Sequence, residues 1–416
     1  MKTSSTTPLL LVLVLVLVGC ASAAGSDEQN ELGWGMTHTQ WGIDQRTPEA
    51  IASMTAQLTA RPMVQAQSIM GWGVGNPEPA PGEFDFASLD GRMSFIRRSG
   101  GIPVITLCCA PDWMKGGEEG ETDWSRLEVA PSPEHYQDFA DLAAEVARRY
   151  PDVRHFMVWN EFKGFFNEST NTWDGEAYTE LYNAVYDAVK QVNPANQIGG
   201  PYLDMAAPPP GLSLSPSSLA GSWGQVDPRT LNAFDTWARE KRGADFVVVD
   251  GIATVEEGAP DRVTALAKLS AVSEWVRQRV DLPLWWAEWY VEPRGAGWSP
   301  ATRTAMNTAA LVQFVRSDVA TALFWNSAPS ASSPTDLWTA DGQPLPFLAV
   351  LQSFNEWFPP GTPLQELGTA PPLFTLASPR MVVLVNVGDQ SATATVDGTT
   401  VTLAPDEVRW VARDTS

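Results

Sequence analysis

Histidine, cysteine and positive charge are all scarce in this sequence. Of 416 residues, three are His and three are Cys, and 27 Lys and Arg stand against 49 Asp and Glu, a formal net charge of −22. The His residues show no metal-ligand spacing and no Cys-x-x-Cys pair occurs, so we expect neither a metal site nor another cofactor. The negative charge repels phosphate backbones, which argues against nucleic-acid binding.

The chain nevertheless has ample material for a folded core. Hydrophobic residues make up 44% of the sequence, charged residues 18%, and 18 residues are Trp. This composition excludes an intrinsically disordered chain, a collagen-like chain and a long coiled coil. The length allows either two or three domains or one large barrel.

The amino-terminal segment has the pattern of an export signal. An apolar run at 9–18 follows Lys2 and is too short to span a bilayer. It leads into Leu-Val-Gly-Cys at 17–20, which resembles the lipobox of bacterial lipoproteins and implies a signal peptide at 1–19, a lipid on the Cys20 sulfur and a tether at 20–31. The alternative is an ordinary signal peptide cleaved near 21–24 (Ala-Ser-Ala-Ala). Either way we expect the mature protein outside the cytoplasmic membrane, and with the lipid it is anchored to the membrane's outer face or the cell surface.

Cys108 and Cys109 are adjacent within an apolar run. A free cysteine behaves as a small hydrophobic residue in a core. Three cysteines are also too few for the disulfide framework of a small secreted domain. We therefore expect both side chains to be buried and not bridged.

Eight short apolar runs alternate with eight helical patterns. Runs such as 102–107 (Ile-Pro-Val-Ile-Thr-Leu) are continuously apolar, as the strands of a parallel sheet buried on both faces require. In 133–149 the residues Phe139, Leu142 and Val146 recur at three- and four-residue steps, which gives a helix one buried stripe. The alternation predicts an α/β fold, a (β/α)8 TIM barrel over 32–358. The predicted strands are 32–38, 63–72, 102–109, 153–160, 197–202, 245–250, 284–289 and 321–326, and the predicted helices are 48–60, 88–99, 133–149, 175–192, 228–242, 261–279, 300–317 and 344–356.

Four of these helices carry a clear start signal. A side-chain oxygen at the N-cap can accept a free backbone N–H, and the proline that follows has no N–H to leave unpaired. The four pairs are Thr47-Pro48, Ser132-Pro133, Asp227-Pro228 and Ser299-Pro300.

Two long insertions follow predicted strands. Residues 206–226 come after the fifth strand and 327–343 after the eighth, and both are rich in Pro, Ser and Ala. Loops at this end of the strands form the active face of a (β/α)8 barrel. We therefore expect both insertions to shape substrate access.

After 359–361 (Pro-Pro-Gly) the helical pattern stops. Alternating runs at 381–387, 392–396, 399–403 and 408–411 predict strands. Asp397-Gly398 lies between two of them and is a strong hairpin signal, because both central residues of the favoured turn take a positive φ. We expect a small accessory antiparallel β domain at 363–416, which is too short for a complete sandwich and could borrow a strand from residues before Leu32.

Two glutamates close predicted strands at the active end of the barrel. Glu161 ends the fourth strand in Val-Trp-Asn-Glu, and Glu288 ends the seventh within Trp-Trp-Ala-Glu-Trp. Burial beside apolar rings raises a carboxyl pKa and is costly unless the group is hydrogen-bonded or used. Such a pair can cleave a glycosidic bond: one acid protonates the leaving oxygen and the other attacks the anomeric carbon. A carboxyl separation of about 5–5.5 Å predicts retention of configuration, and about 6.5–9.5 Å predicts inversion.

At these residues the sequence resembles the retaining glycosidases of clan A, whose (β/α)8 barrels carry an Asn-Glu acid/base after the fourth strand and a Glu nucleophile after the seventh. Within the clan it is most similar to glycoside hydrolase family 39, with its β-xylosidases and α-L-iduronidases. The resemblance implies that Glu161 is the acid/base, that Glu288 is the nucleophile and that Asn160 hydrogen-bonds the sugar 2-hydroxyl. Other stretches that carry it are 75–78 (Gly-Asn-Pro-Glu), 81–86 (Pro-Gly-Glu-Phe-Asp-Phe), 89–90 (Leu-Asp), 110–114 (Ala-Pro-Asp-Trp-Met), 199–201 (Gly-Gly-Pro) and 323–325 (Leu-Phe-Trp).

The sequence departs from that family at two strands. Members often carry an Arg near the end of the second strand and a His-x-Tyr at the sixth. Here the second strand reads Gln-Ala-Gln-Ser-Ile-Met at 65–70, and the sixth ends in Val-Asp-Gly at 249–251. If Asp250 replaces the His, a third carboxylate lies near the pair and raises a neighbouring pKa. Xylosidase or iduronidase specificity therefore does not carry over directly.

Further residues near strand ends are candidates for sugar contacts. Tryptophan rings stack on sugar faces, although Trp is also common in cores. His38 either hydrogen-bonds substrate or is a satisfied buried His, and Lys163 either reaches a polar or anionic substituent or lies on a loop surface. The predicted substrate-binding residues are Asn160, His38, Trp113, Tyr202, Asp250, Trp289, Tyr290 and Trp325.

Together these patterns predict an exported, lipid-anchored retaining glycosidase whose partner is a poly- or oligosaccharide. The predicted catalytic residues are Glu161 and Glu288. The alternative is a non-catalytic carbohydrate-binding lipoprotein that kept the barrel and lost turnover, and the two departures from the family pattern motivate it. Loss of glycan cleavage on mutation of either glutamate separates the two hypotheses.

Overall fold

The computed structural model describes residues 32–42, 46–207, 215–253, 261–293, 295–326 and 335–413. The predicted signal peptide 1–19, the lipidation site Cys20 and the tether 20–31 lie outside these residues. Within the described ranges, every helix is too short or too polar to cross a membrane.

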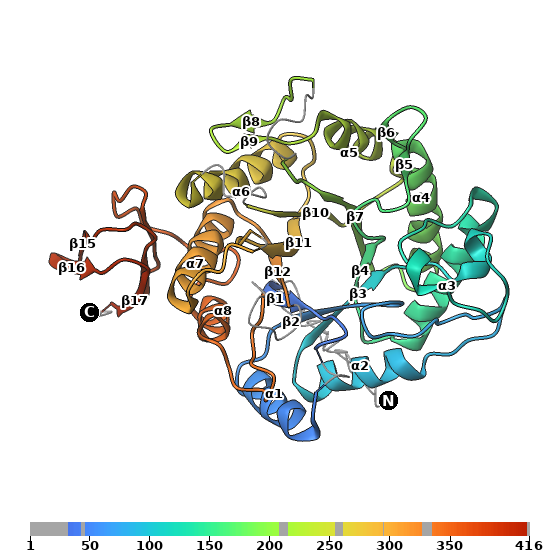
Figure 1. Ribbon diagram of the computed structural model, residues 1–416, viewed down its shortest axis with the longest axis horizontal. Helices are drawn as coiled ribbons and strands as arrows, with labels where there is room; N and C mark the ends of the chain where they lie inside the picture. Colours follow the sequence, from blue (N-terminus) through green and yellow to red (C-terminus); the bar gives the residue numbers. More distant parts are fainter. Residues whose placement is uncertain are drawn as a thin grey trace, which may run out of the picture. The chain divides into compact units, whose positions relative to one another are not determined.

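Eight parallel strands close into a barrel, and each is followed by a helix on its outer side (Figure 1). Going round the barrel the strands follow chain order, and the last pairs with the first, with Gly33 opposite Thr321. The predicted TIM barrel is therefore confirmed. Its strands are β1 (Gly33–Thr37), β2 (Val64–Ser68), β3 (Ile102–Leu107), β4 (His155–Val158), β7 (Gln197–Asp204), β10 (Phe246–Ile252), β11 (Leu284–Tyr290) and β12 (Thr321–Trp325).

The helices begin and end within three residues of the predicted positions. Thr47 and Ser299 accept backbone N–H groups with their side chains, and each is followed by proline, as predicted. Asp227 does the same for the N–H of Arg229. Ser132 differs, because 3₁₀ turn η3 (Pro133–His135) follows it and the α-helix begins only at Tyr136. The helices are α1 (Pro48–Ala60), α2 (Ala87–Arg98), α3 (Tyr136–Arg149), α4 (Gly175–Val192), α5 (Pro228–Glu240), α6 (Arg262–Arg277), α7 (Pro300–Arg316) and α8 (Pro346–Trp357).

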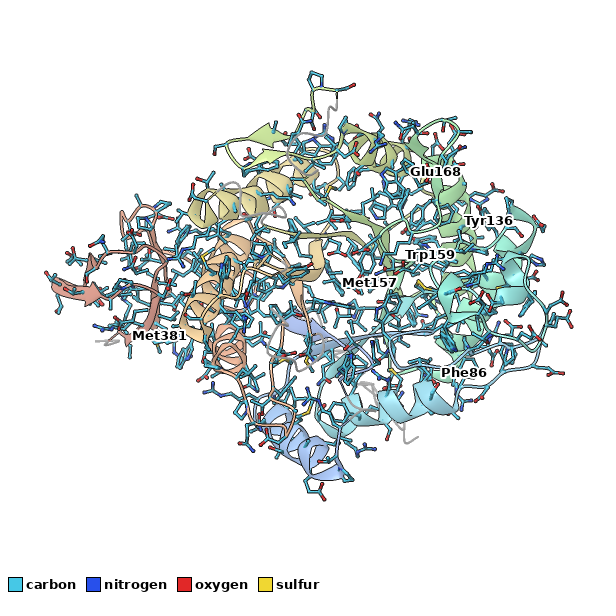
Figure 2. All side chains as sticks on the ribbon, viewed as in Figure 1. Phe86, Tyr136, Met157, Trp159, Glu168 and Met381 are labelled. Carbon is cyan, nitrogen blue, oxygen red and sulfur yellow. A yellow bond between two sulfur atoms is a disulfide. The ribbon has the colours of Figure 1, made fainter. Side chains whose placement is uncertain are left out.

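Side chains fill the barrel interior as well as the layer between the strands and the helices (Figure 2). The rings of Phe246 and Trp285 stack inside the barrel with their centroids 4.0 Å apart, and Met157 belongs to the same buried cluster. This packing closes the barrel below its carboxyl end, so a ligand can approach only from the strand ends.

Short elements decorate the loops at the carboxyl ends of the strands. Two hairpins follow β4 and β7, and 3₁₀ turns follow β3. The hairpin strands are β5 (Phe166–Asn167), β6 (Thr172–Trp173), β8 (Ala220–Gly221) and β9 (Gly224–Gln225), and the turns before η3 are η1 (Asp112–Lys115) and η2 (Trp124–Arg126).

Cys108 and Cys109 are buried, as predicted, but they form a disulfide with each other. The expectation of two unbridged cysteines is therefore wrong. Their Cα atoms lie 3.0 Å apart across a cis peptide bond. Neither the adjacency of the two cysteines nor their apolar surroundings distinguishes a bridged pair from a free one.

The carboxy-terminal segment forms antiparallel sheets on the helical layer. The Trp410 ring packs on Phe354 and Phe358 of the α8 region, and Arg316 of α7 donates to the carbonyl of Thr375. All four predicted strands are confirmed, and the predicted Asp397-Gly398 turn has two positive φ angles. All three strands of the larger sheet come from this segment. The residues before Leu32, from which a strand could be borrowed, lie outside the residues that the structure describes. The strands are β13 (Leu373–Ala377), β14 (Met381–Asn386), β15 (Ala392–Val396), β16 (Thr399–Leu403) and β17 (Glu407–Ala412).

Candidate active site

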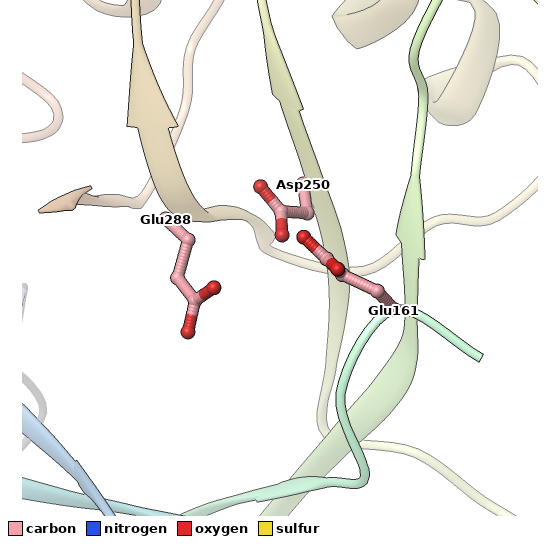
Figure 3. A group of neighbouring side chains, drawn as sticks. All are labelled: Glu161, Asp250 and Glu288. Carbon is pink, nitrogen blue, oxygen red and sulfur yellow. The ribbon is translucent and has the colours of Figure 1, made fainter. Parts of the chain in front are cut away.

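Three carboxyl groups meet at the carboxyl end of the barrel. Glu161 follows β4, Asp250 lies in β10 and Glu288 lies in β11. Oxygen atoms from all three lie within 4.8 Å of one another (Figure 3). The two predicted catalytic glutamates are thus brought together, with Asp250 beside them.

The backbone at this end of the barrel is strained. Glu161 and Glu288 take φ angles of 49° and 56°, and Tyr202 of β7 takes 56°. Each non-glycine residue held in this left-handed region costs on the order of 1–3 kcal/mol, and such residues cluster at active sites. The strain therefore coincides with the carboxyl cluster, which makes the cluster the candidate active site.

A cavity of about 320 Å³ opens over the carboxyl cluster. Glu288 is 9% exposed and Asp250 2% exposed, whereas the Glu161 side chain is 24% exposed. The cavity falls in the size range of small-ligand sites. Its lining residues are Trp72, Glu128, Glu161, Lys163, Asp204, Asp250, Gly251, Ile252, Glu288, Tyr290 and Trp325.

The Glu288 carboxyl is held in an environment that disfavours its charged form. Burial raises its pKa to about 8, and the negative charge of Glu161 adds to the shift. Interactions with Tyr202, Lys163 and Asn160 oppose it, and the Asn160 amide donates to Glu288 Oε1 at 3.4 Å. These three side chains are therefore the groups that favour an ionised Glu288.

Asp250 is the most deeply buried member of the cluster. Its Oδ1 accepts the N–H of Gly251, and burial together with the charges of Glu161 and Glu288 raises its pKa well above the ordinary range. Three carboxyls this close cannot all be ionised at low cost. At neutral pH we therefore assign a proton to Asp250.

A second acid and a buried lysine lie behind the cluster. Burial raises the pKa of Asp204 to about 6, and the charge of Glu161 adds to this shift. Burial lowers the pKa of Lys268 to about 8, while Asp204 and Asp250 oppose the shift, and its ammonium donates to the Ile252 carbonyl at 2.7 Å. Lys268 thus offsets part of the negative charge from the side of α6.

Lys163 connects the cluster to a loop acid. Its ammonium lies 2.9 Å from Glu161 Oε2 and 2.6 Å from Glu128 Oε1, and 5.9 Å from the centre of the Trp72 ring. Burial alone would lower the Lys163 pKa, but the two carboxylates raise it above its usual value. Lys163 is therefore a fixed positive charge beside Glu161 and not a free loop-surface lysine.

Five of the predicted substrate-binding residues lie at the cluster. Asp250, Tyr290 and Trp325 line the cavity, Asn160 contacts Glu288, and Tyr202 is fully buried beneath it. Tyr202 thus interacts with Glu288 from a buried position.

The other three predicted substrate-binding residues, His38, Trp113 and Trp289, do not line the cavity. His38 is buried against Gln65, with Nε2 2.9 Å from its Oε1, and burial lowers the His38 pKa to about 4, so it is a neutral core histidine. Trp113 donates its indole N–H to the Glu78 carbonyl. Trp289 is fully buried among Phe314, Phe324 and Phe347, because its side chain leaves the strand on the helix side.

Sequence reasoning missed three charged residues at the site. Asp204 ends the fifth strand, so the same strand-end rule that identified Glu161 could have found it. Glu128 comes from the long loop after β3 and Lys268 from the middle of α6. Nothing local in the sequence distinguishes these two, because only the folded chain brings them to the strand ends.

The carboxyl cluster also has the geometry of a metal site. Glu161, Asp250 and Glu288 form the one group of three or more His, Cys, Asp or Glu side chains in the described residues whose ligand atoms lie close enough together. However, hard cations take 6–8 or near-octahedral oxygen ligands.

A (β/α)8 barrel with paired acids after its fourth and seventh strands defines the class of glycosidase-type barrels. Residues 78–352 match the profile of glycosyl hydrolases family 39, which covers more than half of the chain. The chain belongs to glycosyl hydrolase family 39 and is a glycosidase.

Solved structures show the same fold at low sequence identity. A glucosidase from Croceicoccus marinus is similar with a TM-score of 0.58 and 15% identity, over 89% of this chain and 80% of that one. A monomeric β-xylosidase from Caulobacter crescentus is similar with a TM-score of 0.55 and 18% identity, over 87% of this chain and 73% of that one. The bacterial orthologue of human α-L-iduronidase is similar with a TM-score of 0.55 and 15% identity, over 88% of this chain and 64% of that one. The comparison with curated proteins yielded no match.

Proposed function

We propose that this chain is a retaining glycosidase in which Glu161 is the acid/base and Glu288 the nucleophile. The observation that carries the proposal is the distance between them: their nearest oxygens lie within 4.8 Å. Retaining enzymes keep the two carboxyl groups about 5–5.5 Å apart, whereas inverting enzymes need about 6.5–9.5 Å to admit a water. The short separation is therefore closer to the retaining geometry than to the inverting one.

The reaction proceeds in two steps. In the first, Glu288 attacks the anomeric carbon while Glu161 protonates the leaving oxygen, which forms a glycosyl-enzyme ester and releases the aglycone. In the second, Glu161 takes a proton from water, which displaces Glu288 from the same carbon. The two inversions give net retention. The Asn160 amide donates to Glu288 Oε1 at 3.4 Å, which supports its proposed role as the donor to the 2-hydroxyl of a sugar attached to Glu288.

The assignment requires an ionised Glu288. Burial raises the Glu288 pKa to about 8, so the proposed activity rises as pH approaches that value. Asp250 holds its proton and so adds no negative charge beside Glu288. Tyr202, Lys163 and Asn160 favour an ionised Glu288. Glu161 is the more exposed of the pair and therefore the one that a leaving group can reach.

The charges around the cavity favour a neutral sugar. Among the described lining residues, five are acids and Lys163 is the one base, and Lys163 already pairs with Glu161 and Glu128. A uronic acid would add a further negative charge without a free partner. We therefore favour neutral glycones, such as those in the names of the xylosidase and the glucosidase, over an iduronate.

The proposal includes export and lipid anchoring through Cys20. The support is the apolar run at 9–18 followed by Leu-Val-Gly-Cys. In a bacterial host the wild-type chain then partitions into the detergent phase with a lipid-sized mass on its first residue, and Cys20→Ala removes both. Ser22→Ala is the matched control. An unlipidated chain that begins near residue 25 would support the ordinary signal peptide instead.

A panel of activated aryl glycosides, as pyranosides and furanosides of both anomers, tests the mechanism. Glu288→Ala abolishes turnover, and Glu161→Ala retains activity best on substrates with good leaving groups, which need no proton. Azide then yields a glycosyl azide of retained configuration with Glu161→Ala and of opposite configuration with Glu288→Ala. Glu168→Ala, an exposed glutamate in the turn between β5 and β6, is the control that changes none of these.

The competing hypothesis is a carbohydrate-binding lipoprotein without turnover. The missing second-strand Arg and the Asp250 in place of His-x-Tyr are its support. Glycan binding by the wild-type chain with no turnover across the panel would favour it. Wild-type turnover in Glu288→Ala would overturn the assigned nucleophile.

A further inference from the structure

A second cavity of about 370 Å³ adjoins the first. Both cavities are lined by Glu161, Lys163 and Asp204, but Glu288 and Asp250 line only the first. Glu161 therefore stands between two hollows, one with the nucleophile and one without. The residues around the second cavity are Glu161, Lys163, Trp173, Leu203, Asp204, Ala206, Ala207, Asp227, Arg229 and Thr230.

The chemistry of double displacement gives these two hollows different occupants. The sugar that becomes attached to Glu288 must occupy the cavity that Glu288 lines. The leaving group departs on the far side of the anomeric carbon, toward the acid that protonates it. The hollow that contains Glu161 without Glu288 lies on that side.

We propose that the second cavity is a leaving-group site that holds a neutral sugar residue, with Trp173 as its stacking platform. The proposal rests on the proposed function, since it uses Glu161 as the acid/base. It makes the natural substrate a glycan in which the group released is itself a sugar.

Trp173 is built as a fixed platform. It ends β6 in the hairpin after β4, and its ring is half-buried. The Phe166 ring packs edge-on against it at 5.0 Å between centroids, and Phe162, next to Glu161, does so at 6.4 Å. An aromatic face held in this way suits the apolar C–H face of a sugar ring.

The polar side of the cavity suits neutral hydroxyl groups. Arg229 is held by Asp227, with Nε 3.1 and 3.0 Å from the two carboxylate oxygens, and it also donates to Asn171 Oδ1 at 2.6 Å. Its charge is thus already compensated. Asp204 also lines the cavity, and its Oδ1 is a buried acceptor without a hydrogen-bond partner in the described residues.

The net charge of the lining disfavours an anionic leaving sugar. The described lining residues include three acids, Glu161, Asp204 and Asp227, and two bases, Lys163 and Arg229. Arg229 already pairs with Asp227, and Lys163 with Glu161 and Glu128, so no free base in the described lining remains to pair with a carboxylate or sulfate.

The experiment compares two substrates with the same glycone, the one accepted in the aryl glycoside panel. One is a disaccharide, for example xylobiose if the panel selects xylose, and the other is the matching glycosyl fluoride, which places only a fluorine atom in the leaving-group site. Trp173→Ala lowers kcat/KM for the disaccharide about ten-fold more than for the fluoride. Trp173→Tyr restores most of the loss, and Trp124→Ala, an exposed Trp outside both cavities, changes neither.

The outcomes separate this inference from the proposed function. Equal losses on both substrates in Trp173→Ala would make Trp173 a structural residue and overturn the leaving-group site alone. If the wild-type chain turns over none of the aryl glycosides or fluorides, both the proposed function and this site are overturned. If Trp173→Ala unfolds, Ala207→Trp fills the cavity instead and must show the same selective loss on the disaccharide. A disaccharide whose leaving sugar is a uronate should react more slowly than the neutral one, and equal rates would refute the charge preference.

Discussion

The Lys163 ammonium lies 2.9 Å from Glu161 Oε2 at the boundary between the two cavities. A positive charge at this position stabilises negative charge throughout the carboxyl cluster and lowers the pKa of Glu288. It therefore works against burial, which raises the same pKa. The balance between the two decides at which pH the nucleophile is ionised.

Replacing Lys163 should move the acidic limb of the pH profile. Catalysis needs an ionised Glu288, whose pKa is raised to about 8, so kcat/KM of the wild-type chain rises with pH through a limb in that region. Lys163→Met removes a charge that lowers this pKa, so the limb moves to higher pH. The check is kcat/KM for an aryl glycoside across pH 5–10, and Lys190→Met, a lysine far from the cluster that pairs with Asp245, is the control. If the acidic limb of Lys163→Met stays at the same pH or moves to lower pH, the electrostatic role of Lys163 is contradicted.

Asp250→Asn should leave the acidic limb where it is. We assign a proton to Asp250, and Asn is a neutral side chain of the same shape that can still accept the Gly251 N–H. Turnover should stay within about ten-fold of the wild type, whereas Asp250→Ala loses more because it leaves a cavity and an unpaired N–H. A limb that moves to lower pH in Asp250→Asn would show that Asp250 is ionised, since the change would then remove a negative neighbour of Glu288.

The barrel could be predicted from the sequence because its signals are local. Continuous apolar runs, a stripe such as that of Phe139 and Leu142, and a cap such as Thr47 each report on a few neighbouring residues. The Ser132 start was misplaced by one turn because local signals do not distinguish a 3₁₀ turn from the first turn of an α-helix.

The site was predictable only as far as strand ends could locate it. Glu161 follows β4 and Glu288 lies near the end of β11, whereas Lys268 approaches from a helix and Trp173 from a hairpin inside a loop. Trp289 shows the remaining difficulty, because adjacent residues on a strand point to opposite faces. An error of one residue in the predicted register therefore moves a side chain from the buried core to the cavity, or the reverse. Pattern reasoning could not decide between the two for Trp289.

Trp325 and Trp289 should therefore respond differently to truncation. Trp325 lines the cavity, so Trp325→Ala should lower kcat/KM about ten-fold, mainly through KM, with little change in Tm. Trp289 is fully buried among aromatic rings, so Trp289→Ala should destabilise the fold by about 3–5 kcal/mol. Thermal unfolding and kinetics on both variants check the prediction. A KM effect in Trp289→Ala without loss of stability would return that residue to the substrate site.

Glu288→Gln should make the folded chain more stable, and increasingly so as pH rises. Burial raises the Glu288 pKa from 4.5 to about 8, so between these values the folded chain keeps a proton that the unfolded chain has released. Stability contributed by this group is therefore lost as pH increases through that window, by about 3 kcal/mol at pH 7. Glutamine does not titrate and escapes the loss. Urea unfolding at pH 5, 6, 7 and 8 should show a difference from the wild type that grows with pH, while Glu168→Gln, an exposed glutamate, follows the wild type. A constant difference across this range would mean that Glu288 is already ionised at pH 5, and the nucleophile would then be active well below the limb expected from its burial.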